Sequence, residues 1–203
     1  MSLVAKCPAC GGEVTWKLGD SLVVVCPYCR SAIARADRTL TDLGKVADLV
    51  ETGSVLQLGL GGTWKGVRYT LVGHAQLAHP GGGKWDEWYA AFSDGRWGWL
   101  AEAQGQHYLT FRGHAPMVPA YDAIEVGQIV FDQFVAAEKS HARALGAEGE
   151  MPFAWQRDAE WAFADLSGPS SDAERALVAE RFGSSRLCRD LENLYERLLE
   201  RRR

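Results

Sequence analysis

Apolar residues alternate with polar ones along most of this chain, a pattern that favours half-buried β-strands over helices. Alternating stretches of this kind lie at 13–17, 21–25 and 63–72. The strongest pattern lies at 85–92 and 96–100, where two aromatic-rich stretches flank Ser93-Asp94-Gly95. Asp-Gly between alternating hydrophobic runs predicts a β-hairpin with a tight turn. The chain is therefore expected to be mainly β, built from short strands and turns.

The same kind of pattern continues beyond a first β module expected at 54–118. Leu56-Gln57-Leu58-Gly59 recurs 68 residues later as Ile124-Glu125-Val126-Gly127, and aromatic-containing stretches follow each copy. Residues 131–145 have enough Ala, Glu and Lys to suit a helix, but we interpret them as strand, with a turn at 146–149. A second β module is predicted at 119–169. It is either a diverged copy of the first or similar only through common turn sequences.

Helical periodicity dominates only at 170–203. Ser171-x-x-Glu174 has the spacing of a capping box, which predicts a helix to about Phe182 with Gly183 as its C-terminal cap. A second apolar stripe follows with the spacing of one helix face, formed by Leu187, Leu191, Leu194 and Leu198. The prediction is a helical tail that packs either on the body of the protein or on another chain.

Four of the five cysteines form two Cys-x-x-Cys pairs, Cys7/Cys10 and Cys26/Cys29, separated by fifteen residues. This spacing is typical of a four-cysteine zinc ribbon, because two tight turns can direct four sulfurs to the corners of a tetrahedron. The strands at 13–17 and 21–25 are expected to pair and bring the two turns together. Four thiolates leave no open coordination position, so one structural Zn²⁺ is favoured over a redox pair or an iron site.

These patterns give a complete expected architecture. A zinc ribbon occupies 1–36, a polar linker follows at 37–53, and one or two small β-barrel-like or β-sandwich modules come next. A short C-terminal α-helical hairpin ends the chain.

Composition and charge narrow the classes of partner. The chain has 203 residues, 47% of them hydrophobic and 24% charged, which suits a folded protein rather than a disordered one. The net charge of the chain is −4. Residues 1–36 alone carry a net charge of +2, and a Zn²⁺ bound to four thiolates carries −2 and offsets it. A nucleic-acid partner is therefore not expected, because phosphate binding needs a basic face.

Residues 1–6 lack the features of a secretory signal, and the longest apolar run, at 22–26, cannot span a bilayer. A cytoplasmic protein without membrane insertion is therefore predicted.

The aromatic hairpin supplies the candidate ligand-binding residues. Four of its tryptophans and one acidic side chain make up the set: Trp85, Glu87, Trp88, Trp97 and Trp99. One interpretation is that the rings fill the core of a small barrel, since each indole buries a large apolar area. The other is an exposed aromatic groove for a peptide or an amine, with an acidic residue suited to a cationic ligand.

Several sequence motifs resemble those of a known bacterial family. They are Cys7-Pro8-Ala9-Cys10-Gly11-Gly12, Cys26-Pro27-Tyr28-Cys29, Leu58-Gly59, Tyr69-Thr70-Leu71-Val72-Gly73, Trp85-Asp86-Glu87-Trp88-Tyr89 and Gly95-Arg96-Trp97-Gly98-Trp99-Leu100-Ala101-Glu102. Over about residues 6–169 the chain resembles proteins catalogued as domain of unknown function 4178. The resemblance implies a zinc ribbon followed by a β-rich module, often with a second related module. It also implies a loose association with membrane-stress and polyamine-related systems, and it implies no activity. The helical pattern after Pro169 departs from the family, for which further strands are expected.

No stretch carries a catalytic signature. The five histidines show no zinc-binding i,i+4 pair, and no nucleophile elbow or phosphate-binding loop is present. The favoured function is a non-enzymatic zinc-ribbon adaptor whose Trp-rich module binds a protein segment or a small ligand in a bacterial complex. The alternatives are a nucleic-acid-binding zinc ribbon and, from the resemblance alone, a polyamine-pathway enzyme or regulator.

Overall fold

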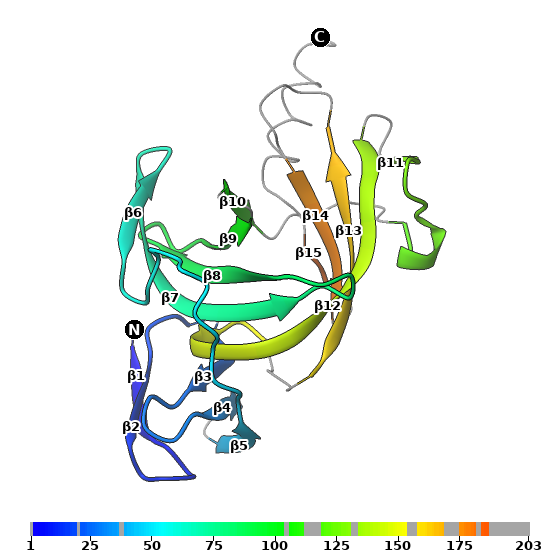
Figure 1. Cartoon of the computed structure of the whole chain (residues 1–203). Helices are drawn as coiled ribbons and strands as arrows, with labels where there is room; N and C mark the ends of the chain where they lie inside the picture. Colours follow the sequence, from blue (N-terminus) through cyan, green and yellow to red (C-terminus); the bar gives the residue numbers. More distant parts are fainter. Residues whose placement is uncertain are drawn as a thin grey trace.

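The protein is almost entirely β in structure (Figure 1). The computed structural model describes residues 2–19, 21–36, 39–103, 106–111, 119–130, 134–153, 158–168, 175–181 and 184–186. Within these residues there are fifteen strands and one 3-10 turn, Tyr121–Ala123. No helix in the described part of the chain has the length and apolar character to cross a membrane. The predicted mainly β fold is confirmed.

The N-terminal part consists of two hairpins, each closed by one of the cysteine pairs. Their strands are β1 (Leu3–Lys6), β2 (Glu13–Trp16), β3 (Val23–Val25) and β4 (Ser31–Ala36). β1 pairs with β2, and β3 pairs with β4, so the predicted pairing of 13–17 with 21–25 is wrong. Each strand pairs across its own short cysteine turn, which is the most local partner open to it.

The expected linker at 37–53 also contains regular structure. β5 (Thr39–Lys45) pairs with β4 and extends the second hairpin to three strands. Within the next residues, Ala47 forms a parallel bridge to Gly146 of the body. The stretch is therefore part of the fold instead of a free connector.

Two five-stranded meanders follow. The first contains β6 (Gly61–Trp64), β7 (Val67–Ala78), β8 (Lys84–Phe92), β9 (Trp97–Ala103) and β10 (Gln106–Phe111). The second contains β11 (Ile129–Val130), β12 (Phe134–Met151), β13 (Glu160–Ser167), β14 (Arg175–Arg181) and β15 (Ser184–Arg186). In both units every strand pairs antiparallel with the next one along the chain. β7 and β12, the second strands of the two units, also pair antiparallel and join the units into one continuous sheet (Figure 1).

The two units begin with the same turn. Gly59 and Gly127 have positive φ angles of 86° and 87°, a conformation that glycine adopts without strain. The Gly59 N–H donates to the Leu71 carbonyl, as the Gly127 N–H does to the Ala136 carbonyl, both at 2.8 Å. A register shift follows in each case, after Leu71 in β7–β8 and after Ala136 in β12–β13. The recurrence at 56–59 and 124–127 thus coincides with a repeated structural unit.

The C-terminal helix prediction is wrong where the structure describes the chain. Arg175–Arg181, expected to be helical, is strand β14 and pairs with β13. Ser184–Arg186 is strand β15, at the expected start of the second helix. The leucine stripe beyond Arg186 lies outside the described residues. Periodicity could not distinguish the two, because the short apolar run Ala176-Leu177-Val178-Ala179 suits a strand as well as a helix, and β13 offers an edge for pairing.

The long strand β12 connects the body to the cysteine hairpins. The turn predicted at 146–149 is absent, and β12 continues through it to pair with β3 at Val23 and Val24. A shared hydrophobic core fills this junction. It includes Val23, Val25, Ala32 and Val46 from the N-terminal part, and Val72, Tyr89, Trp99, Ala147 and Met151 from the sheet. The N-terminal part is therefore built onto the body rather than tethered to it.

Candidate metal centre and ligand groove

The two cysteine turns are built alike. In each turn the first cysteine donates its N–H to the carbonyl five residues on, at 2.7 Å from Cys7 to Gly12 and 2.9 Å from Cys26 to Ser31. The carbonyl of each first cysteine accepts an N–H from the residue four positions on, which has a positive φ angle in both turns: 76° at Gly11 and 62° at Arg30. This shared geometry directs both sulfurs of each pair to one side.

The four sulfurs converge as the sequence predicts. All four Sγ atoms lie within 4.8 Å of one another, with Cys7–Cys29 and Cys10–Cys26 each 3.7 Å apart. A tetrahedron with metal–sulfur bonds of about 2.3 Å has edges of about 3.8 Å. These separations are far too long for a disulfide, whose sulfurs lie about 2.05 Å apart. The cluster is therefore compatible with a four-coordinate metal site.

The surroundings favour the thiolate form of at least one ligand. Hydrogen bonds from Ser31 lower the pKa of Cys29 to about 6. The Gly12 N–H lies 3.4 Å from Cys10 Sγ, a further amide contact of the kind that orients metal-bound sulfur. Although the Gly12 N–H opposes it, hydrogen bonds with Cys29 and the other thiols raise the pKa of Cys10 to about 12, and burial raises the pKa of Cys7. A thiolate is the form that binds metal, so a bound cation is what would hold these other thiols in that form.

The aromatic set does not form a groove. Trp88 and Trp99 are 3% and 2% exposed and pack in separate clusters on opposite faces of the sheet. Trp97 packs beside Tyr89, while Trp85 packs against Phe163 of the second unit. Strand alternation sends Trp88 to one face of the sheet, while the other three tryptophans share the opposite face. Trp99 is buried there and Trp85 and Trp97 are half-buried against neighbouring rings, so the four rings do not line one exposed site.

Glu87 is likewise unsuited to an incoming cation. It is only 4% exposed, and Trp85 Nε1 donates to its carboxylate at 3.3 Å. The aromatic hairpin itself is present as predicted, with β8 and β9 paired across the Asp-Gly turn. Its side chains serve the core.

A buried charged cluster that the sequence did not reveal lies where the two units meet. His74 Nε2 is 2.8 Å from Asp86 and its Nδ1 is 3.3 Å from Glu148, so the ring joins β7, β8 and β12. The ring also stacks on Trp88, with centroids 3.8 Å apart. Gln76 Nε2 donates to Asp86 at 3.1 Å, and Thr52 donates to the same carboxylate.

These contacts shift the pKa values in a consistent way. Burial alone would lower the pKa of His74, but its hydrogen bonds to Asp86 and Glu148 raise the pKa above its usual value. Although burial opposes it, the same hydrogen bonds lower the pKa of Asp86. The hydrogen bond from His74 lowers the pKa of Glu148. The three groups therefore stabilise one another in their charged forms, as expected of a structural ion cluster.

A second histidine contact has the composition of a catalytic triad but not its geometry. His79 Nε2 lies 2.8 Å from Glu138 and 2.9 Å from Ser140 Oγ. The other ring nitrogen, Nδ1, accepts the Gly81 N–H at 3.0 Å. The carboxylate and the hydroxyl thus share one nitrogen, whereas a triad places them on opposite nitrogens.

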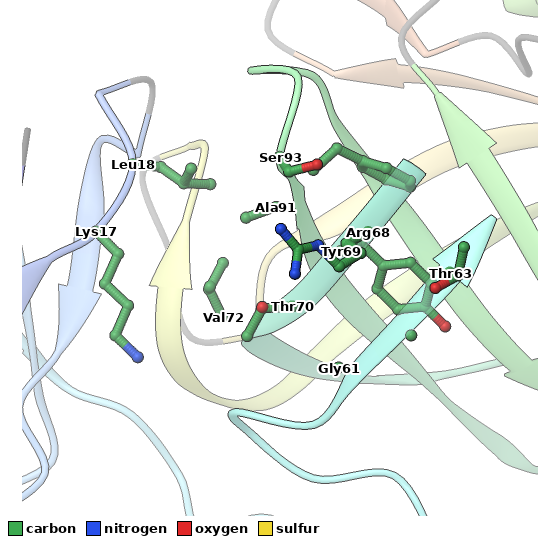
Figure 2. A pocket seen from close by; sticks show the side chains of 12 residues that line it. Lys17, Leu18, Gly61, Thr63, Arg68, Tyr69, Thr70, Val72, Ala91 and Ser93 are labelled. Atoms are coloured by element: carbon green, nitrogen blue, oxygen red, sulfur yellow. The ribbon is translucent and has the colours of Figure 1, made fainter. Parts of the chain in front are cut away.

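An open groove of about 680 Å³ lies between the cysteine hairpins and the first unit (Figure 2). One wall is the β2–β3 loop, with Lys17 and Leu18. The floor consists of adjacent residues of β7 and β8, and β6 completes the other wall at 61–63. Its volume lies within the range of small-molecule sites, about 300–1,000 Å³. No sequence motif pointed to it, because its residues come from four separate segments.

Comparison with known families gives the chain its classification. A family model described as Domain of unknown function (DUF4178) matches residues 57–188. The chain belongs to this family. The DUF4178 match begins at the turn that opens the first unit and ends just after β15, so it spans both meanders. The cysteine hairpins lie outside it. No curated protein and no solved structure matches the chain.

Proposed function

We propose that this protein is a non-enzymatic zinc-ribbon adaptor whose first β unit binds a protein segment or a small ligand. The four-cysteine cluster supports zinc as the metal, because tetrahedral thiolate sites suit Zn²⁺ and leave no coordination position for a substrate. The metal's role is then structural: it links two hairpins whose own core is one small cluster, which includes two of the cysteines together with Val14, Trp16, Val24 and Ile33.

The observation that carries the proposal is the groove between the metal ribbon and β6–β8. It replaces the aromatic hairpin as the binding surface of the adaptor, since the indole rings are committed to packing. The polyamine alternative draws no support from the hairpin, where Asp86 and Glu87 are buried and hydrogen-bonded.

Site-specific photo-crosslinking in the protein's native cells tests this function. A photoreactive residue replaces Thr70 in the groove or, as the matched control, Val135 in the second unit. The two positions are equivalent, because Thr70 pairs with Gly61 and Val135 pairs with Ile129 at the outer end of corresponding hairpins. We expect an adduct of defined mass at position 70 and none at position 135. No adduct at 70, or the same adduct at both positions, would contradict the proposed function.

A further inference from the structure

We infer that the groove between the ribbon and the first unit binds a small organic anion, one with carboxylate or phosphate oxygens attached to an apolar body. This inference rests on the proposed function and names the chemical class of ligand for the same site. It follows from the charge of the groove, the apolar character of its floor and the rigidity of its walls.

The groove is cationic although the protein as a whole is acidic. The chain has a net charge of −4, but the charged side chains among the described lining residues are Lys17 and Arg68, both positive. Lys17 comes from the β2–β3 wall and Arg68 from β7 in the floor, and Figure 2 shows their side chains on two sides of the open space. Both side chains are largely exposed, so their charge is available to a ligand.

The remaining lining residues suit the rest of such a ligand. Hydroxyl groups of Thr63, Tyr69, Thr70 and Ser93 line the groove and can donate to anionic oxygens. Val72 and Ala91 supply an apolar floor. A few polar groups above an apolar surface are the usual composition of a small-molecule site.

The wall that carries Lys17 is held in place before any ligand arrives. The backbone N–H groups of Lys17 and Leu18 donate to the Glu150 carboxylate at 2.7 and 3.1 Å. Glu150 is 2% exposed and sits at the end of β12, where that strand pairs with β3. On the other side of the loop, the Arg35 guanidinium donates to the Leu18 carbonyl at 3.1 Å. A fixed wall lowers the entropy cost of binding, which is characteristic of a preformed site.

The second unit lacks these features although it shares the topology. When Thr70 is aligned with Val135, the position of Arg68 falls on the neutral Gln133, which lies outside the described residues. The register places Val135 at the position of Thr70. The cationic character therefore belongs to the first unit alone and is not a general property of the repeat.

Titration of the full-length, zinc-loaded protein with simple anions tests the inference. The probes are phenyl phosphate and benzoate, with neutral benzamide as the shape-matched control, followed by the backbone amide NMR signals of Arg68, Thr70 and Ser93. We expect saturable shifts with the anions at millimolar concentration, and affinity for benzamide at least fivefold weaker. The relative affinities of phenyl phosphate and benzoate decide between the two anion types.

Three variants assign the effect to the groove. Lys17→Gln and Arg68→Gln are each expected to weaken binding of the preferred anion about tenfold. Lys65→Gln, which removes a cation from the same β6–β7 hairpin but outside the groove, should leave the affinity within twofold. Equal binding of benzamide, or equal loss in all three variants, would overturn the inference.

The two proposals fail separately. A crosslink at position 70 without anion binding would leave the adaptor function standing and reject the anionic ligand class. Anion binding without any crosslink at position 70 in cells would reject the adaptor function while keeping the site.

Discussion

Gly73 and Gly149 mark the closest approach of the two units. The two residues are direct partners in the β7–β12 pairing. A Cβ atom on Gly73 would lie 1.8 Å from the Glu150 carbonyl oxygen, and one on Gly149 would lie 2.3 Å from the Val72 carbonyl oxygen. Both obstacles are backbone atoms, which cannot rotate away as a side chain can. These glycines therefore set how closely the units join.

Replacing the first of them should destabilise the whole sheet. Gly73→Ala is expected to lower the free energy of unfolding by about 3 kcal/mol, because the strands must separate at a buried pair. Urea denaturation measures the change. Gly19→Ala is the control, since a Cβ there meets nothing within 4 Å, and its effect should stay within about 0.5 kcal/mol. Equal effects of the two substitutions would contradict the close approach.

His74 gives stability a dependence on pH. The pKa of His74 is higher in the folded protein than in the unfolded chain, where it is about 6.5. The contribution of His74 to the free energy of unfolding is therefore complete below about pH 6.5 and is lost as the pH rises through the pKa of the folded state. The lowered pKa values of Asp86 and Glu148 act in the other direction, and their contribution is lost as pH falls below about 4. The cluster's contribution should therefore be greatest between about pH 4.5 and 6.5.

The variant His74→Gln should remove the decline above pH 6.5 and lower stability at pH 6 by about 3 kcal/mol, because Asp86 loses its buried partner. Thermal unfolding across pH 4–9 measures both effects. His107→Gln serves as the control, since this half-exposed ring lies 3.7 Å from Glu102. If both variants keep the wild-type pH profile, the cluster is not its cause.

Among the structural elements, those defined by local sequence were the most predictable. The cysteine turns follow from Cys-x-x-Cys spacing, and the β8–β9 hairpin follows from the Asp-Gly turn. β14 was misassigned because Arg-Ala-Leu-Val-Ala-Glu-Arg suits a helix by intrinsic propensity. The sequence did contain one signal for a strand. Val178-Ala179-Glu180 resembles Leu100-Ala101-Glu102 of β9, and the two triplets occupy equivalent places, since Val178 pairs with Ala164 of β13 as Leu100 pairs with Trp88 of β8.

Truncation tests this strand assignment. A chain ending at Gly168 loses β14 and β15 and leaves β13 with an unpaired edge, so it should be less stable and prone to aggregate. A chain ending at Arg186 keeps every described strand and should retain most of the wild-type unfolding free energy. Chemical denaturation and light scattering measure the outcome. Similar losses in both truncated chains would argue against β14 as the element that protects β13.

The groove and the His74 cluster depend on pairings that the sequence does not encode locally. His74, Asp86 and Glu148 meet only because β7 pairs with both β8 and β12 in a particular register. Lys17 faces Arg68 only because Glu150 anchors the β2–β3 loop from the far end of β12. A one-residue change in register would exchange the two faces of a strand, so reasoning from residue types alone could not assemble either site.

For the molecule as a whole, the metal ribbon and the sheet share one core. Val23 and Val25 of β3 pack in the same cluster as Met151 and Tyr89 of the two units. Loss of the metal should therefore reach beyond the ribbon. We expect one zinc per chain by elemental analysis, and a fall of about 10 °C or more in the unfolding midpoint after chelation.

Cysteine variants separate metal loss from other effects of the chelator. Cys10→Ser should lose the zinc and reproduce the lowered unfolding midpoint without any chelator. Cys188→Ser, which changes the fifth cysteine, should keep one zinc per chain and the wild-type midpoint. A zinc-free protein that unfolds at the wild-type temperature would show that the ribbon does not support the sheet.

The way the ribbon joins β12 also bears on valency. A duplicated scaffold ordinarily offers two equivalent sites and can bridge two identical ligands. Here one wall of the groove is the β2–β3 loop, which Glu150 of β12 holds beside the floor formed by the first meander, and the described chain carries a single loop of this kind. The repeated strand order thus enlarges the sheet without a second groove of this kind in the described residues, and one chain should saturate at one ligand.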